Sequence, residues 1–83
     1  MISETDKEVL TQFGKHLKAL RLSKDLTYRK MALHCNIDYS DIQRFESGKI
    51  NITLLTLIEL SKALEIEPKE LLEFNQVLNK PGF

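Results

Sequence analysis

Four polar side chains fall on one side of a short helical pattern near the middle of the chain. The pattern covers residues 39–47 and stops at Gly48, with Ile42 and Phe45 facing inward. The outward side chains are Tyr39, Ser40, Gln43 and Arg44. An arginine can donate a two-pronged hydrogen bond to guanine, a glutamine can pair with adenine in the same manner, and a tyrosine can pack on a thymine methyl group. This spacing predicts contacts to base edges in a DNA groove.

Asp41 stands among these side chains, but its carboxylate carries a negative charge, like the DNA phosphates. A carboxylate near a groove repels phosphates, although it can accept a hydrogen bond from cytosine. In the first turn of a helix it also stabilises the helix N-terminus through the macrodipole. We expect this second role, and a restriction on the tolerated DNA sites if Asp41 points into the groove.

A second helical pattern precedes the first and completes a two-helix unit over residues 27–47. It runs over residues 27–35 with Thr27 as its N-cap, and its buried side is Met31, Ala32 and Cys35. The turn is Asn36-Ile37-Asp38, in which Asn36 is expected to be left-handed and Asp38 to cap the next helix. Two short helices joined in this way form a helix-turn-helix, whose second helix enters the DNA major groove.

Three further helices are expected to support this unit in an all-α, five-helix domain. The first opens near Glu4 after a Ser3–Asp6 capping box, and Asp25 closes it into a short connection. The fourth is capped by Thr53, and the last begins at Pro68 and extends over residues 68–79. Apolar residues at helical spacing mark these three helices: Leu10, Phe13, Leu17, Leu20, Leu54, Leu57, Ile58, Leu64, Leu71, Phe74 and Leu78.

The charge distribution suits local contact with phosphates. The net charge is zero, which counts against a general nucleic-acid binder. Between Lys15 and Lys49, however, eight lysines and arginines face four acidic residues, an excess of four positive charges. The expected phosphate contacts flank the base-reading helix: Arg29, Lys30, Lys49, Asn51 and Thr53.

Length and composition predict one domain over residues 1–83 and exclude several classes of protein. The single Cys35 allows no intrachain disulfide, and with no signal peptide or membrane-spanning run the expected location is the cytoplasm. His16, His34 and Cys35 lack the paired spacing of metal ligands. No Gly-rich phosphate loop, nucleophile motif or spaced carboxylate pair is present. We therefore expect neither an enzyme nor a cofactor or metal site.

The order of these motifs resembles the Cro/repressor (XRE-like) helix-turn-helix family of phage and bacterial regulators. The likeness covers about residues 13–72, most of the chain. The stretches that carry it are Phe13–Arg21, Leu26–Thr27, Met31–Ala32, Asn36–Ile37, Ile42–Lys49, Leu57–Leu64 and Pro68–Leu72.

The resemblance also implies two roles. In this family an arginine late in the first helix pairs with a glutamate near the end of the recognition helix, which implies a structural ion pair between Arg21 and Glu46. Family members commonly carry a phosphate-binding glutamine at the first position of the second helix. Here that residue is Tyr28, whose phenol can donate to phosphate but cannot form the same amide bridge to the base-reading residues.

The resulting hypothesis is a transcription regulator, a homodimeric repressor that binds double-stranded DNA at an inverted-repeat operator. A restriction–modification controller, a phage-type repressor and a toxin-neutralising regulator would all look like this. Phe74, Val77 and Leu78 are candidates for the dimer interface, or they only close the domain's own core. The alternative is a protein-interaction module of the same fold with weak or no DNA binding, whose partner would be a toxin, an endonuclease or another regulator. Zero net charge, Asp41 and Tyr28 favour that alternative.

Overall fold

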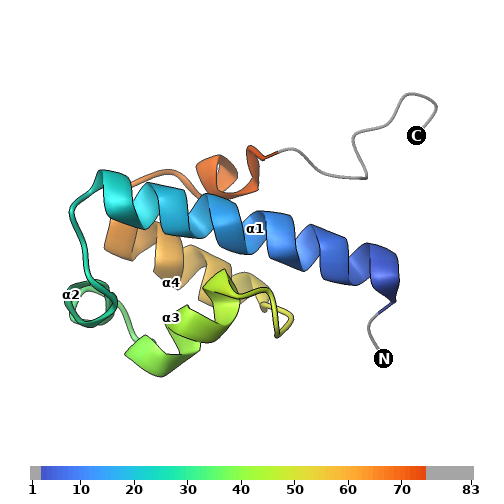
Figure 1. The fold of residues 1–83 in the computed structure, drawn as a ribbon. Coiled ribbons are helices and arrows are strands. Elements are labelled where there is room, and N and C mark those ends of the chain that lie inside the picture. Colours follow the sequence, from blue (N-terminus) through green and yellow to red (C-terminus); the bar gives the residue numbers. More distant parts are fainter. Residues whose placement is uncertain (1–2, 75–83) are drawn as a thin grey trace.

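The chain folds as four α-helices and one short 3-10 helix (Figure 1). The computed structural model describes residues 3–74. The helices are α1 (Glu4–Ser23), α2 (Tyr28–Ala32), α3 (Tyr39–Glu46), α4 (Leu54–Leu64) and the 3-10 helix η1 (Pro68–Leu72). Residues 3–74 contain no strand, so the expected all-α fold is confirmed. No helix in this range is long and apolar enough to cross a membrane.

Most helix starts follow the expected capping chemistry. The Ser3 hydroxyl accepts a hydrogen bond from the Asp6 backbone N–H at 3.1 Å, and the Asp6 carboxylate accepts one from the Ser3 N–H. The hydroxyls of Thr27 and Thr53 each accept from a backbone N–H three residues later, both at 3.1 Å. Asp38 occupies the N-cap position of α3, but its side chain makes no capping hydrogen bond.

The end of α2 differs from the sequence-based prediction. The helix ends at Ala32 rather than Cys35, so residues 33–38 connect it to α3. Asn36 was expected in the left-handed region, yet among residues 3–74 positive φ angles occur at Asp25, Gly48 and Glu65. The Asn36 N–H donates instead to Glu59 Oε1 of α4 at 3.2 Å. A side chain from another helix therefore satisfies this backbone N–H.

The expected helix over residues 68–79 is also wrong as a single helix. Its start is correct, with Pro68 at the first position, but the 3-10 helix ends at Leu72, and Glu73 leaves the helical region with ψ near 66°. The Glu70 carbonyl, which would accept from residue 74 in an α-helix, lies 2.6 Å from His16 Nε2. Since a carbonyl only accepts, His16 must donate from Nε2. Val77 and Leu78 lie outside the described residues.

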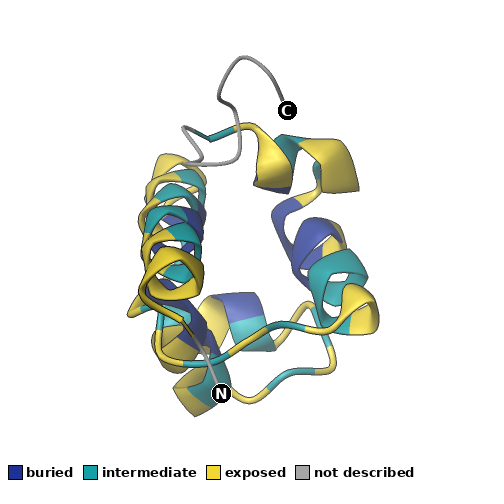
Figure 2. Cartoon of the chain, turned by 90° about the vertical axis from the view of Figure 1, so that its right-hand side faces the viewer, coloured by how far each residue is buried: buried dark blue, intermediate teal, exposed yellow. Residues whose placement is uncertain are grey.

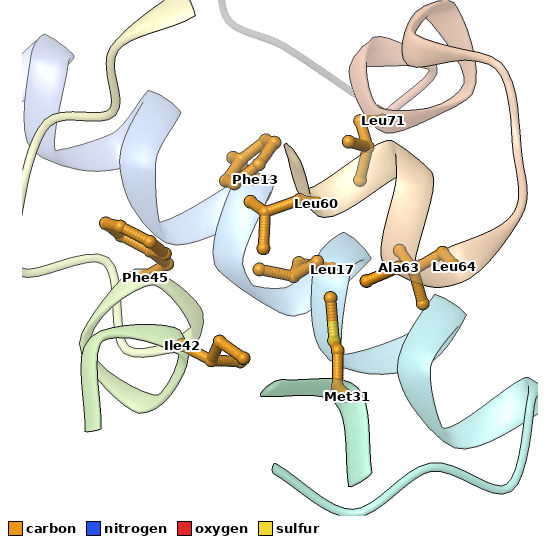
Figure 3. Packing of buried hydrophobic residues seen from close by; sticks show 9 residues of the cluster. All are labelled: Phe13, Leu17, Met31, Ile42, Phe45, Leu60, Ala63, Leu64 and Leu71. Atoms are coloured by element: carbon orange, nitrogen blue, oxygen red, sulfur yellow. The ribbon is translucent and has the colours of Figure 1, made fainter. Parts of the chain in front are cut away.

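Every element contributes a fully buried side chain to one core. Leu17, Met31, Ile42, Leu60 and Leu71 each come from a different helix and have no exposed surface. Phe13, Phe45, Ala63 and Leu64 fill the remaining space between them (Figure 3). Figure 2 shows that buried residues line the inner sides of the helices and exposed residues the outer sides. Burial of one such large side chain contributes roughly 1.5–3 kcal/mol, so this cluster fixes how α3 sits on α1.

The backbones of α1 and α3 approach each other closely at Gly14. A Cβ atom at this position would lie 2.3 Å from the Glu46 carbonyl oxygen and 2.8 Å from that of Phe45. Both obstacles are backbone atoms of α3, which cannot rotate away as a side chain can. Glycine at residue 14 therefore sets the distance between α1 and α3.

We expect Gly14→Ala to lower the free energy of unfolding by up to about 2 kcal/mol, because overpacking usually costs about 1–3 kcal/mol. Alanine favours a helix interior by about 1 kcal/mol over glycine, so the steric effect must exceed that gain. Urea unfolding followed by circular dichroism measures the change. Ala19→Gly, at an exposed position of α1, is the matched control for helix propensity alone. An unchanged or higher stability of Gly14→Ala would contradict the packing argument.

Candidate nucleic-acid interface

The structure brings the four candidate base-contact residues to one exposed side of α3. Tyr39, Ser40, Gln43 and Arg44 are all exposed, while Ile42 and Phe45 on the other side are buried. The polar row therefore stands on a helix whose position is set by core packing. This arrangement suits insertion of α3 into a groove, because the row can reach base edges without the helix leaving its core contacts.

Arg44 and Asp41 form an ion pair along this row. Nη2 of Arg44 donates to Oδ1 of Asp41 one turn earlier on α3. The side chains are 57% and 36% exposed, so both remain open to solvent and to a ligand. Asp41 also lies in the first turn of α3, as expected for a residue that stabilises the helix N-terminus. The pairing itself was missed, although the spacing of three residues could have indicated it.

Arg29 and Tyr39 connect α2 with the start of α3. The guanidinium carbon of Arg29 lies 4.3 Å from the centroid of the Tyr39 ring, a cation–π geometry. A candidate phosphate contact and a candidate base contact are therefore packed on each other. Sequence spacing alone could not indicate this, because ten residues and a turn separate the two side chains.

The residues of the implied structural ion pair, Arg21 and Glu46, come together between α1 and α3. Arg21 Nε donates to Glu46 Oε2 at 2.7 Å and Nη2 donates to Oε1 at 3.2 Å. A third donor, Nη1, reaches the Leu26 carbonyl at 2.7 Å. The side chains are only 6% and 3% exposed. The hydrogen bond to Glu46 raises the pKa of Arg21 further above its usual value. This pair fastens the end of α3 to α1.

Tyr28 belongs to the surroundings of this ion pair. The guanidinium carbon of Arg21 lies 4.1 Å from the centroid of its ring, and the side chain is half-buried. Burial and, after it, the nearby Glu46 carboxylate raise the pKa of the phenol, which therefore stays protonated at neutral pH. The residue expected to touch phosphate thus also packs against the buried pair.

The other candidate phosphate contacts differ in how far their side chains are engaged. Asn51 accepts a hydrogen bond from the Ile52 N–H at 2.9 Å, and Thr53 caps α4. Lys30 and Lys49 are exposed and form no ion pair within residues 3–74. Among the candidate phosphate contacts, these two lysines are cations that remain free to meet a phosphate.

The connection between α2 and α3 is anchored to α4 by Glu59. Its Oε1 accepts from the Asn36 N–H, and its Oε2 lies 3.2 Å from Lys62 Nζ. The Asn36 hydrogen bond and then Lys62 lower the pKa of Glu59. Nothing in the sequence pattern pointed to this contact, because it joins residues far apart in the chain. It limits how the α2–α3 unit can shift relative to α4.

A second surface of the described residues is apolar, and it borders the candidate phosphate contacts Asn51 and Thr53. A groove runs between α1, the loop before α4, and η1, and its lining includes Val9, Leu10, Leu54, Leu57, Leu72 and Phe74. Leu54 and Leu55 are 72% and 77% exposed, and Leu72 is 49% exposed. Phe74 is half-buried and packs edge-on against Phe13, with ring centroids 5.9 Å apart.

Metal ligation has no support within the described part of the chain. Residues 3–74 contain no group of three His, Cys, Asp or Glu side chains that could hold a metal ion. The Cys35 thiol donates to the Met31 carbonyl at 3.4 Å, and burial raises the pKa of this thiol. A thiol of raised pKa is a weak nucleophile near neutral pH, in keeping with a packing role.

Comparison with known proteins places these features in a recognised group. A family model described as Helix-turn-helix matches residues 17–71. The Control protein C.BamHI of Bacillus amyloliquefaciens is 35% identical over 68 residues, which are 81% of this chain and 84% of that protein. The crystal structure of the restriction-modification controller protein C.AhdI from Aeromonas hydrophila is 37% identical with a TM-score of 0.72. The matched region covers 75% of this chain and 94% of the C.AhdI chain. The crystal structure of the wild-type restriction-modification controller protein C.Esp1396I is 28% identical with a TM-score of 0.71. The match covers 78% of this chain and 86% of the C.Esp1396I chain.

Proposed function

The chain belongs to the helix-turn-helix family of DNA-binding transcription regulators, and from this premise we propose that it is a restriction–modification controller. In this proposal the protein is a single-domain homodimer that binds an inverted-repeat operator through α3 and acts without catalysis. The observation that carries it is the exposed polar row of α3, held by a buried core side and by the Arg21–Glu46 pair. The controller proteins among its relatives supply the biological class.

Within the bound complex each residue of the row has a chemical role. Arg44 donates to guanine and Gln43 pairs with adenine, whereas Ser40 is less selective. Tyr39, supported by the stacked Arg29 guanidinium, packs on a thymine methyl group or reaches a phosphate. Around the row, phosphate contacts come from α2 and from the loop before α4: Tyr28, Arg29, Lys30, Lys49, Asn51 and Thr53.

The affinity for DNA should fall steeply with salt concentration. If about six phosphates are neutralised per bound unit, the slope of log K against log salt is about −5. We expect Lys49→Ala to make this slope shallower by about 1, because one cation fewer displaces counterions. Fluorescence anisotropy on a labelled duplex measures the slope. The control is Lys69→Ala in η1, which lies on the other side of the domain from α3 (Figure 1). A flat salt response would contradict the proposed phosphate contacts.

A dimer is proposed because one recognition helix covers only a few base pairs. The apolar groove supports an interface there, with Leu54 and Leu72 as its exposed members, and Leu55 is exposed next to Leu54 on α4. Phe74 packs on Phe13, which favours a core role for Phe74 beside an interface role. Val77 and Leu78 stay predictions, because they lie outside the described residues.

We expect the double substitution Leu54→Ser/Leu55→Ser to shift the protein from dimer to monomer at tens of micromolar. Sedimentation equilibrium measures the assembly state. Leu22→Ser replaces another exposed leucine, 54% exposed on α1, and should leave the assembly unchanged. A monomeric wild-type protein at these concentrations would argue against the homodimer, and an unaffected double variant would move the interface elsewhere.

The experiment that tests the function is selection of randomised duplexes by the purified protein, followed by sequencing. The expected result is an inverted repeat whose half-site centres are about one helical turn apart. No enrichment, even at low salt, would overturn DNA reading by this protein alone. The fold would then serve as a protein-interaction module or as a regulator that needs a second protein.

A further inference from the structure

We propose that Asp41 determines how selectively Arg44 recognises its base, and that it does so through the Asp41–Arg44 ion pair rather than by touching DNA. The inference rests on the proposed function, since it concerns the same base-reading helix. It assigns to Asp41 a positioning role in specificity, in addition to its place at the N-terminus of α3.

The geometry places the carboxylate where it can orient the guanidinium. Oδ1 of Asp41 accepts from Nη2 of Arg44, and both side chains stand on the exposed side of α3. The Arg44 backbone is fixed as well, because its carbonyl accepts from the Ser47 hydroxyl at 2.9 Å and from the Lys49 N–H at 3.3 Å. With the backbone and one terminal nitrogen held, the planar guanidinium keeps few orientations.

The other charged groups near Asp41 do not compete with Arg44 for its carboxylate. Arg29, Asp38, Tyr39 and Asp41 border the same hollow between α2 and α3. The Arg29 guanidinium lies on the Tyr39 ring. Within residues 3–74, Asp41 forms its ion pair with Arg44. Asp38 adds a second negative charge nearby and makes no side-chain hydrogen bond to α3.

Two consequences for DNA binding follow from this pairing. A guanidinium has five N–H donors in a rigid fork, so one can bind Asp41 while others donate to the O6 and N7 atoms of guanine. The carboxylate also offsets the positive charge of Arg44, which weakens its attraction to phosphates of any sequence. The first effect strengthens binding to the correct base and the second weakens binding to random DNA. Both raise the ratio of specific to non-specific binding.

A double-mutant cycle separates this role from the other roles open to Asp41. The four proteins are wild type, Asp41→Ala, Arg44→Ala and the double variant. Anisotropy titrations at fixed salt would use three duplexes: the selected site, the same site changed at the base pair whose preference depends on Arg44, and a random duplex. We expect Asp41→Ala to lower the preference at that base pair about two- to fivefold, the range of an exposed ion pair. Binding to the random duplex should tighten. In the Arg44→Ala background, removal of Asp41 should not change the base preference further.

Asp38→Ala is the matched control, because it removes an acidic residue from the start of the same helix without touching Arg44. Circular dichroism and thermal melting establish that each variant is folded. An equal loss of preference with and without Arg44 would mean that Asp41 reads a base itself, and it would overturn the proposal. So would the same loss in Asp38→Ala, or an unchanged preference in Asp41→Ala. No base preference in the wild-type protein would overturn the proposed function and this inference together.

Discussion

Replacing Arg21 with alanine should lower the free energy of unfolding by about 3–5 kcal/mol, the range for a buried ion pair that loses one partner. The Glu46 side chain, which is 3% exposed in the wild-type structure, would lose its two guanidinium donors. It also removes the donor to the Leu26 carbonyl and the cation that stacks on Tyr28. A small domain has about 5–15 kcal/mol in total, so this loss is a large share of the stability. Urea unfolding followed by circular dichroism measures the change.

Two further variants show whether the unpaired charge is the cause. The double substitution Arg21→Met/Glu46→Leu removes both charges and should be more stable than Arg21→Ala, since an apolar pair can replace a buried ion pair. Lys7→Ala removes the cation of the exposed Lys7–Glu4 pair and should change stability little. A small loss for Arg21→Ala, similar to that for Lys7→Ala, would show that the buried pair does not hold α3 in place.

Replacing Arg44 with alanine should abolish the preference at one base pair, with a loss of discrimination of roughly 5- to 150-fold. The reason is that alanine has no donors for the two acceptors of guanine. Binding to random duplex should weaken less than binding to the selected site, because on random DNA only the positive charge of Arg44 is lost, which leaves the Asp41 carboxylate unpaired. Competition titrations with site variants measure the preference at each position.

Arg44→Lys distinguishes shape from charge in this prediction. Lysine keeps the positive charge but cannot present a planar fork, so it should restore affinity for random duplex without restoring the base preference. Ser40→Ala, one turn away on the same exposed side of α3, should have a smaller effect on selectivity. An unchanged preference in Arg44→Ala would remove Arg44 from the base-reading set.

The sequence was sufficient to predict those structural features that depend on residues close together in the chain. The caps at Ser3, Thr27 and Thr53 and the positive φ of Gly48 follow from side-chain chemistry and turns a few residues long. The inward positions of α3 follow from helical spacing in the same way. These local rules also define the exposed row that forms the candidate site.

The sequence was insufficient where a distant residue decides the local conformation. Asn36 is not left-handed, and its N–H donates to Glu59, 23 residues later in the chain. The last helix ends at Leu72, before the predicted residue 79, and the Glu70 carbonyl there accepts a hydrogen bond from His16 of α1. The stacking of Arg29 on Tyr39 and of Arg21 on Tyr28 likewise needs the packed helices. Such contacts join separate helices, and the spacing of residues along the chain does not predict them.

The shortness of α2 and α3 makes the proposed DNA-reading surface an all-or-none property of the domain. The two helices have five and eight residues, below the length of about 12–15 residues at which an isolated helix becomes even marginally stable in water. Side chains of α1 and α4, Arg21 and Glu59, hold them in place. Amide hydrogens of α2 and α3 should therefore exchange with solvent only when the whole domain opens. The concentration of active protein in a cell would then follow its global folding equilibrium, with no half-competent state between folded and unfolded chains.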